Sequence, residues 1–270
     1  MHAHGEKKHK EQVRIDALSG PRWTGLPRWL IGIDDTDNLE SRGTGFRARM
    51  LGEALAERGL ARVSAITRHQ LLVAPEIPYT SHNSSACLSA EAADRAAVIA
   101  VCRAFLVAES AAGSDAGLCV AAWDAVDAQA QAFGQRAKVE IVTQAEALAR
   151  AAGAGVFLEG LTGTHGGVIG ALAAVGLRVG GDDGRFLWLP GLRELGGTCT
   201  VGELFERGHI DEVQDEAGVA LPSSTRVDVG AWVRPVLRAG KAVLLVEEVA
   251  DHGERTWRIL ARDRIKQLSD

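Results

Sequence analysis

The sequence predicts an α/β (α+β) fold with a small antiparallel, β-rich region at the C-terminal end of the chain. Over roughly the first 190 residues, short apolar runs alternate with segments whose apolar residues recur at helical spacing. The last 45 or so residues instead contain β-rich runs separated by turn-forming residues. The chain has 270 residues, of which 46% are hydrophobic and 24% charged, which is ordinary for a soluble globular protein with a substantial core.

The first strong element is the apolar run 29–33, which ends abruptly in an acidic stretch and therefore predicts a buried strand feeding a polar loop. A helix is expected next, because apolar residues recur at helical spacing from Phe46 to Leu55 and Gly59 is placed as its stop. Two prolines between residues 74 and 83 predict an extended, irregular connection. The other strands are expected at 62–67, 84–88, 118–122, 139–142 and 155–159. The other helices are expected at 91–111, 124–133, 144–152 and in a segment that ends near Gly176.

The C-terminal region predicts an antiparallel meander. Three β-rich runs, at 227–237, 242–249 and 256–261, are separated by short turn-forming segments. Glycine, proline and charged residues are frequent between 189 and 223, so a domain boundary is expected there.

The net charge of −5 is unevenly distributed along the chain. Residues 1–22 carry five basic and three acidic side chains and residues 226–270 carry nine and seven, which leaves −9 for the centre. This distribution argues against a large nucleic-acid groove formed by bulk charge, whereas a local basic patch near the C-terminal end is compatible with it.

Membrane and secretory signals are not expected in this chain. Its apolar runs are too short to cross a bilayer, and the polar N-terminal stretch does not have the apolar core of a signal peptide, so we expect a cytoplasmic protein with no membrane partner. The four cysteines form no C-x-x-C pair, which predicts neither a disulfide framework nor a zinc ribbon.

The acidic stretch after the first strand is the strongest candidate site. Asp34, Asp35 and Asp37 place three carboxylates at the end of an apolar strand, where open α/β sheets bind their ligands. Mg²⁺ holding a phosphate substrate would relieve the repulsion between these charges, and the alternative is a solvated turn in which Asp37 caps a helix. The residues that follow and open the expected helix would welcome an anion through a guanidinium, backbone amides and a hydroxyl. They are Arg42, Gly43, Thr44 and Gly45.

Two nucleotide-binding motifs were weighed against this pattern. Gly43, Gly45 and Ala48 match G-x-G-x-x-A, but the match begins nine positions after the strand and no acidic residue closes the next strand, so a nicotinamide or flavin site is disfavoured. No Walker motif is present, so any use of ATP lies outside the P-loop framework.

Two further segments are candidate walls of a site. A proline-stiffened loop carries polar side chains at 77–83, and the glycine-dense turn 160–170 ends a strand and opens a helix whose amides suit a phosphate or carboxylate. The alternatives are an ordinary polar connection for the first segment and tight packing of a helix on a sheet for the second. The candidate binding residues in these segments are Ile77, Tyr79, His82, Asn83, His165, Gly166 and Gly167.

Three motifs together resemble the archaeal tRNA agmatidine synthetases. They are IGIDDTD at 31–37, IPY at 77–79 and GVIGALAAVG at 167–176, in the order and comparable spacing of that family. The resemblance covers roughly residues 29–189. It implies a kinase-like domain that uses ATP and Mg²⁺, followed by a ferredoxin-like domain. It also implies a reaction that attaches agmatine to a cytidine in the anticodon of an isoleucine tRNA, with ATP converted to AMP.

The resemblance also implies roles for individual residues. Asp34, Asp35 and Asp37 become candidates for metal and phosphate handling, and Arg42 and Gly43 match the family's next motif. That motif carries a threonine that is phosphorylated in the family, for which Thr44 is the candidate here. The implied domains are a flexible segment 1–28, a kinase-like domain 29–115, a ferredoxin-like domain 116–200 and a small β-rich domain 201–270.

The sequence therefore predicts an ATP- and Mg²⁺-dependent phosphotransferase or ligase that resembles tRNA agmatidine synthetase and acts on an acceptor such as tRNA with agmatine or another amine. A basic run in the last 16 residues favours an RNA partner. Two alternatives stay open: a kinase or ligase for a small metabolite, and a non-catalytic nucleotide-binding regulator. Homo-oligomerisation is left open as well.

Overall fold

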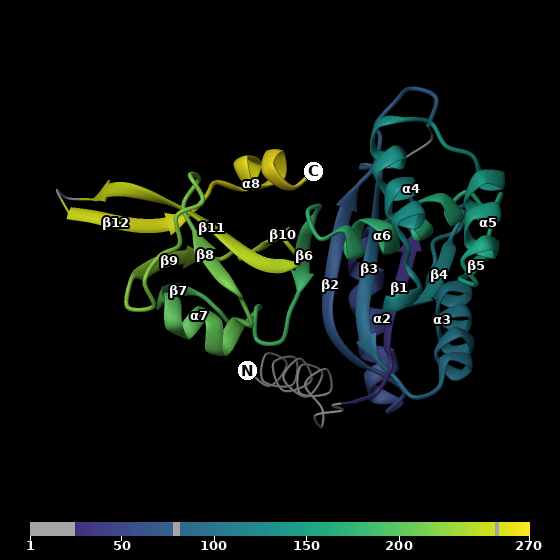
Figure 1. Cartoon of the computed structure of the whole chain (residues 1–270), viewed down its shortest axis with the longest axis horizontal. Coiled ribbons are helices and arrows are strands. Elements are labelled where there is room, and N and C mark those ends of the chain that lie inside the picture. Colours follow the sequence, from purple (N-terminus) through teal and green to yellow (C-terminus); the bar gives the residue numbers. More distant parts are fainter. Residues whose placement is uncertain (1–24, 78–81, 252–253) are drawn as a thin grey trace.

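The computed structural model describes residues 25–77, 82–251 and 254–270, which fold into two halves that share one sheet (Figure 1). The strand order in the first half is β5-β4-β1-β3-β2, and every neighbouring pair in it is antiparallel. These strands are β1 (Arg28–Asp34), β2 (Arg62–Gln70), β3 (Ser84–Glu91), β4 (Gly117–Ala122) and β5 (Phe157–Gly160).

Helices cover both faces of this half-sheet. On one face, α2 (Thr44–Glu57) and α3 (Arg95–Glu109) pack on Ile31 and Ile33 of β1. On the other face, Leu30 packs with three helices in a second core. These are α4 (Ala128–Val139), α5 (Gln144–Gly153) and α6 (Val168–Gly180). Successive residues of β1 thus face opposite cores, which is why a central strand covered on both faces is apolar at consecutive positions.

Strand β6 (Arg185–Trp188) joins the two halves, because it pairs with β2 on one side and with β10 on the other. The second half lies beside the first in Figure 1, and it surrounds an apolar core of its own. Its elements are β7 (Gly197–Thr200), α7 (Val201–Gly208), β8 (Glu212–Gln214), β9 (Arg226–Gly230), β10 (Val236–Arg238), β11 (Lys241–Asp251), β12 (Glu254–Ile259) and α8 (Arg262–Ser269).

The expected elements agree with the structure except in a few segments. The strand expected at 139–142 is wrong: Val139 ends α4, and Thr143 begins α5 with a capping box in which its hydroxyl accepts from the Glu146 amide. Val139 and Ile141 are exposed, so no sheet covers the run whose apolar character suggested a strand. The expected antiparallel meander holds for β10, β11 and β12, whereas β9 pairs parallel with β12.

The domain limits proposed from the sequence stay predictions. Strand β4, from the second of those domains, pairs directly with β1 of the first, and Asp34 lies opposite Gly117 in that pairing. All four cysteines are buried and unbridged. No helix within the described residues has the length and apolar character that a membrane span needs.

A close approach between β1 and α6 fixes the spacing of the sheet and this helix. A Cβ added to Gly32 of β1 would overlap the backbone carbonyl of Ala171 in α6. Glycine is therefore required at this position for packing, because only hydrogen lets the two backbones come this near. The spacing matters for the site, since β1 ends two residues later at Asp34.

A buried polar network ties α4 to the sheet. His69 of β2 is fully buried, with Nδ1 2.9 Å from Asp183 Oδ1 and Nε2 2.8 Å from the Thr67 hydroxyl. The second oxygen of Asp183 pairs with Lys138 of α4. Asp183 lies just before β6, so the network links β2, α4 and the start of β6.

This network predicts a loss of stability in acid. Burial, and then the charges of Arg178 and Lys138, lower the pKa of His69 from 6.5 to about 3. The ring stays neutral in the folded chain while the unfolded chain takes up a proton below pH 6.5, so stability falls as the pH falls from 6.5 towards 3. We expect the free energy of unfolding to be about 3 kcal/mol lower at pH 4.5 than at pH 7.5 on account of His69.

Urea unfolding at the two pH values measures this effect. Because carboxylates also titrate in this range, the relevant quantity is the difference between the wild-type chain and His69→Gln, which keeps hydrogen-bonding groups without the titration. The variant should lose less stability in acid than the wild type. An equal loss in both proteins would show that His69 carries no such linkage.

Candidate functional site

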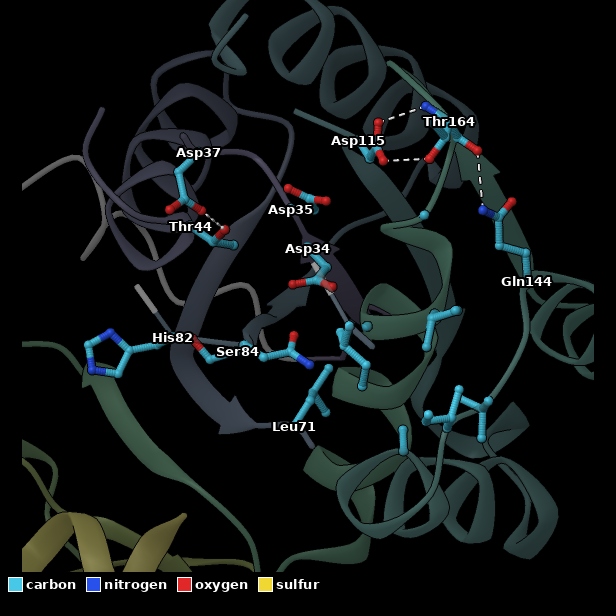
Figure 2. A pocket seen from close by; sticks show the side chains of 18 of the residues that line it. Asp34, Asp35, Asp37, Thr44, Leu71, His82, Ser84, Asp115, Gln144 and Thr164 are labelled. Atoms are coloured by element: carbon cyan, nitrogen blue, oxygen red, sulfur yellow. Dashed lines mark hydrogen bonds between the residues drawn. The ribbon is translucent and has the colours of Figure 1, made fainter. Parts of the chain in front are cut away.

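A cavity of about 260 Å³, here called the acidic pocket, lies where β1 ends. In the close-up, Asp34 and Asp35 lie in the middle, with the Asp37–Thr44 pair on one side and the Asp115–Thr164 pair on the other (Figure 2). Four carboxylates thus line one small space: those of Asp34, Asp35, Asp37 and Asp115. The other lining residues are Leu71, Ile77, His82, Asn83, Ser84, Ala137, Glu140, Ile141, Val142, Gln144, Gly166, Ile169 and Gly170.

Antiparallel pairing brings these segments together. The end of β1 lies beside the beginning of β4 and of β3, since Asp34 faces Gly117 and Ile33 faces Ala86. Asp115 and Ser84 therefore reach the pocket from the starts of their strands. Helices α2 and α6 also begin here, with Gly43 and Gly167 as N-caps that offer no side-chain cap, so the positive ends of both helix dipoles lie near the carboxylates.

Asp34 lies at the centre of the pocket, against α6. A Cβ at Gly170 would overlap Asp34 Oδ2, so the glycine leaves the space that the carboxyl group fills. Burial, then the charges of Asp35 and Asp37, raise the pKa of Asp34 to about 8. A positive charge in this pocket would favour the ionised form and remove the repulsion.

Asp35 has a left-handed backbone, with φ of 48°. Aspartate tolerates this conformation better than most residues, and here it turns the chain between the end of β1 and the acidic loop. Burial and the charge of Asp115 raise the pKa of Asp35 to about 6. The left-handed turn and the crowded carboxylates make this position a candidate functional residue.

Asp37 and Thr44 form the other side of the pocket. The Thr44 hydroxyl donates to Asp37 Oδ1 at 2.9 Å and lies 3.1 Å from the hydroxyl of Thr36, and both threonines are buried. Asp37 therefore stays beside the start of α2. It is not the helix N-cap, as the alternative interpretation of a solvated turn predicted, because Gly43 occupies that position.

Asp115 organises the glycine-dense turn. Its Oδ1 accepts a hydrogen bond of 2.7 Å from the Thr164 amide, and its Oδ2 accepts one from the Thr164 hydroxyl. Its backbone carbonyl accepts from the Gly167 amide at 2.9 Å. The Thr164 carbonyl in turn accepts from the Gln144 side chain of α5 (Figure 2). These contacts hold the turn before α6 against the carboxylates.

A second cavity of about 370 Å³, here called the arginine pocket, adjoins the acidic one. Three arginines line it: Arg42 before α2, Arg49 within α2 and Arg68 of β2. The guanidinium of Arg42 lies 3.7 Å from the centre of the Phe46 ring. The two pockets share a wall formed by Asp37, Thr44, His82 and Ser84.

The acidic pocket fits a phosphate-bound Mg²⁺ better than a metal held by protein alone. Within residues 25–77, 82–251 and 254–270, no three His, Cys, Asp or Glu side chains are grouped closely enough to hold an ion. Mg²⁺ commonly takes only one or two carboxylates and completes its shell with water and substrate phosphates. Asp34, Asp35 and Asp37 supply such oxygen ligands beside a pocket that suits an anion.

The residues singled out in the sequence divide between the two pockets. Those in the acidic pocket are Asp34, Asp35, Asp37, Thr44, Ile77, His82, Asn83 and Gly166. Arg42, Gly43 and Gly45 line the arginine pocket.

Two of the singled-out residues that the structure describes line neither pocket. His165 is exposed, with φ of 69°, and Gly167 is buried against Gly117. Tyr79 lies outside the described residues.

Several lining residues were missed in the sequence. Asp115 and Ser84 precede or begin strands, whereas the pattern of an open α/β sheet predicts ligands only where strands end. Thr164 was visible in the glycine-dense segment, but nothing marked it above its neighbours. The apolar wall, which includes Leu71, Ile141 and Val142, carries no motif.

No protein-family model and no curated protein sequence matches the chain. Among solved structures it is similar to a complex of TiaS with its isoleucine tRNA and ATP, with 26% sequence identity and a TM-score of 0.50 over 56% of this chain and 36% of that chain. It is also similar to apo TiaS, a tRNA agmatidine synthetase, with 25% identity and a TM-score of 0.48 over 55% of this chain and 35% of that one. A tRNA fluorescent labeling enzyme gives 26% identity and a TM-score of 0.49 over 55% and 36%.

The chain thus spans about a third of the length of the proteins it resembles. The family resemblance seen in the three sequence motifs has its counterpart in three dimensions, although the resemblance stops well short of the whole chain. Over 56% of its length, the chain shares its fold with the tRNA agmatidine synthetase TiaS.

Proposed function

We propose that the chain is an ATP-dependent RNA-modifying enzyme that binds Mg·ATP at the wall between the acidic and arginine pockets and joins an amine to a tRNA cytidine. ATP would activate the cytidine oxygen as a phosphate ester, and this oxygen would leave with the phosphate as the amine nitrogen bonds to the cytidine carbon. The observation that carries the proposal is this shared wall. The acidic pocket with its carboxylates lies on one side of it, and the arginine pocket with its guanidinium groups lies on the other. A metal-bound triphosphate is a ligand that needs both. The similarity to a TiaS–tRNA–ATP complex supports the same choice.

In this proposal, one or two of the carboxylates of Asp34, Asp35 and Asp37 would hold Mg²⁺, and the ion would neutralise charge on the phosphates. Arg42 and the amides at the start of α2 bind phosphate oxygens. The Thr44 hydroxyl is the candidate phosphoryl acceptor, and Asp37 Oδ1, 2.9 Å away, is placed to accept its proton. Asp115 keeps the glycine-dense turn in position across the pocket.

The far wall of the acidic pocket suits the amine. Leu71, Ile141 and Val142 are apolar, and Glu140 and Asp34 lie in the same lining. A primary amine on an apolar stem, such as agmatine, would place its stem on these side chains and its charge by a carboxylate.

We propose a cytoplasmic location, and we retain the domain limits at 115/116 and 200/201 as part of this proposal.

Titration with Mg·ATP tests whether the chain binds this nucleotide, which the proposal requires. The wild-type chain should bind Mg·ATP saturably at one site, and Arg42→Gln should weaken binding about tenfold, because a charge-assisted hydrogen bond to phosphate is lost. Arg58→Gln is the matched control, since Arg58 lies at the opposite end of the same helix and donates only to the Ala54 carbonyl. Failure of the wild-type chain to bind Mg·ATP would contradict the proposal.

A further inference from the structure

Three side chains of the basic run near the C-terminal end, which the sequence suggested as an RNA contact, form ion pairs within the described residues. Arg258 pairs with Glu247 at 2.9 Å, Arg264 with Glu216 at 2.7 Å and Lys266 with Asp263 at 3.3 Å. The carboxylates beside these cations oppose the binding of an RNA backbone there. A second group of arginines, which form no ion pair within the described residues, lies elsewhere.

They lie at the seam between the two halves. Arg49 projects from α2 into the arginine pocket. Arg193 is exposed on the loop after β6, and Arg234 is half-buried just before β10. In Figure 1, β6 and β10 are the strands that lie between the halves. We call Arg49, Arg193 and Arg234 the arginine track.

The structure describes no ion pair between a track arginine and a carboxylate of the described residues. Their neighbours differ in this respect: Arg47 pairs with Glu109, and Arg68 and Arg185 both pair with Asp270. Arg49 and Arg234 instead donate to the backbone carbonyls of Gly45 and Val233 at 3.1 and 2.6 Å. These bonds fix the side chains without neutralising their charge.

The track arginines also act on one another. Burial, then the charges of Arg193 and Arg42, lower the pKa of Arg49 to about 10, while Glu53 acts in the opposite direction. Burial, then Arg193, Arg49, Arg185 and Arg262, lower the pKa of Arg234 to about 10. Like charges gathered in a partly buried seam favour an anion that bridges them.

An aromatic ring lies beside one member of the track, Arg234. The guanidinium groups of Arg234 and Arg262 lie 5.4 and 5.3 Å from the centre of the Trp232 ring, which is only half-buried. A basic groove with an aromatic side chain on which a base can stack is the usual platform for single-stranded nucleic acid.

We propose that the arginine track binds consecutive phosphates of a single-stranded RNA segment and leads that strand from Trp232, past Arg234 and Arg193, to Arg49 in the arginine pocket, which shares a wall with the acidic pocket. This inference rests on the proposed function and names the surface that would present the RNA to it. A strand fits better than a lone nucleotide, because the arginines come from three separate elements and continue beyond the pocket wall that Mg·ATP would occupy.

Binding of a short, fluorescently labelled single-stranded RNA across a range of salt concentrations tests the proposal. The double variant Arg49→Gln/Arg193→Gln should bind about tenfold more weakly than the wild type. Its plot of log affinity against log salt should be shallower by about 1.4, or about 0.7 for each phosphate contact removed. Arg58→Gln should match the wild type; Arg58 is the C-cap of α2 and, like Arg49, donates to a carbonyl four residues earlier.

Parallel titration with Mg·ATP separates this inference from the proposed function. Arg193→Gln should bind Mg·ATP as the wild type does. RNA binding with wild-type affinity and salt slope in the double variant would overturn the track while leaving the enzyme proposal standing. Mg·ATP binding without any RNA binding would also overturn the track, and it would leave only the ATP half of the enzyme proposal. Track-dependent RNA binding without Mg·ATP binding would instead overturn the proposed function and leave the track.

Discussion

Replacing Asp35 by asparagine should lower RNA-dependent ATP turnover by at least about 100-fold, because the variant loses one of the charges that would hold Mg²⁺ on the phosphates. Asparagine tolerates the left-handed backbone at this position, φ 48°, so the turn should survive the change. The folded chain should be as stable as the wild type or more so, since the charge of Asp35 opposes ionisation of Asp34. Loss of activity together with retained or increased stability is the signature of a residue kept for function.

Steady-state ATP turnover and the melting temperature, measured on the same preparations, check this prediction. Asp124→Asn is the matched control, since that side chain is exposed and 3.7 Å from its nearest cation, Arg28. The control should change neither quantity. If Asp35→Asn kept full turnover, the acidic pocket would not be the catalytic site.

Replacing Gly32 by alanine should destabilise the chain by about 3 kcal/mol, close to the upper end for overpacked cores, because the added Cβ meets a backbone carbonyl rather than a side chain. For a chain of this size that loss corresponds to a fall in melting temperature of about 6–12 °C. Since β1 carries Asp34 and α6 carries Gly170, separation of the two elements should also widen the acidic pocket and weaken binding of Mg·ATP.

Gly52→Ala provides the comparison. Gly52 is buried within α2, but a Cβ there would meet its nearest neighbour, Val63, at an ordinary 3.5 Å. This variant should be unchanged or more stable by up to about 1 kcal/mol, because alanine favours the helix. Thermal unfolding of both variants distinguishes a close approach from a general intolerance of change; equal stability of Gly32→Ala and the wild type would contradict the packing described for β1 and α6.

The sequence was most informative where local pattern decides the structure. The apolar run that ends at Asp34 is β1, and the glycine-dense segment is the turn into α6. Asp34, Asp35 and Asp37 could be found because they are neighbours in the sequence. Their partner Asp115 could not, because only the antiparallel pairing of β1 with β4 brings it to the same place.

Apolar character alone was misleading at 139–142. The run looked like a strand, but the capping box at Thr143 begins a helix immediately after it, and Ile141 lines the pocket instead of pairing in a sheet. The arginine track was hidden for a similar reason. Arg49 and Arg193 lie in the part of the sequence that is acidic on average and Arg234 lies in the C-terminal part, so only the fold brings the three together.

The central claim is that this pocket uses ATP to modify RNA, and analysis of the nucleotide products tests it most directly. The purified chain is incubated with Mg·ATP alone, with bulk tRNA, and with tRNA together with agmatine or other amines, and ADP is separated from AMP. The account predicts AMP that forms only when RNA and an amine are both present, and that is lost in Asp35→Asn. Turnover with a small molecule and no RNA would point to a metabolite kinase or ligase, and no turnover under any condition would contradict the account.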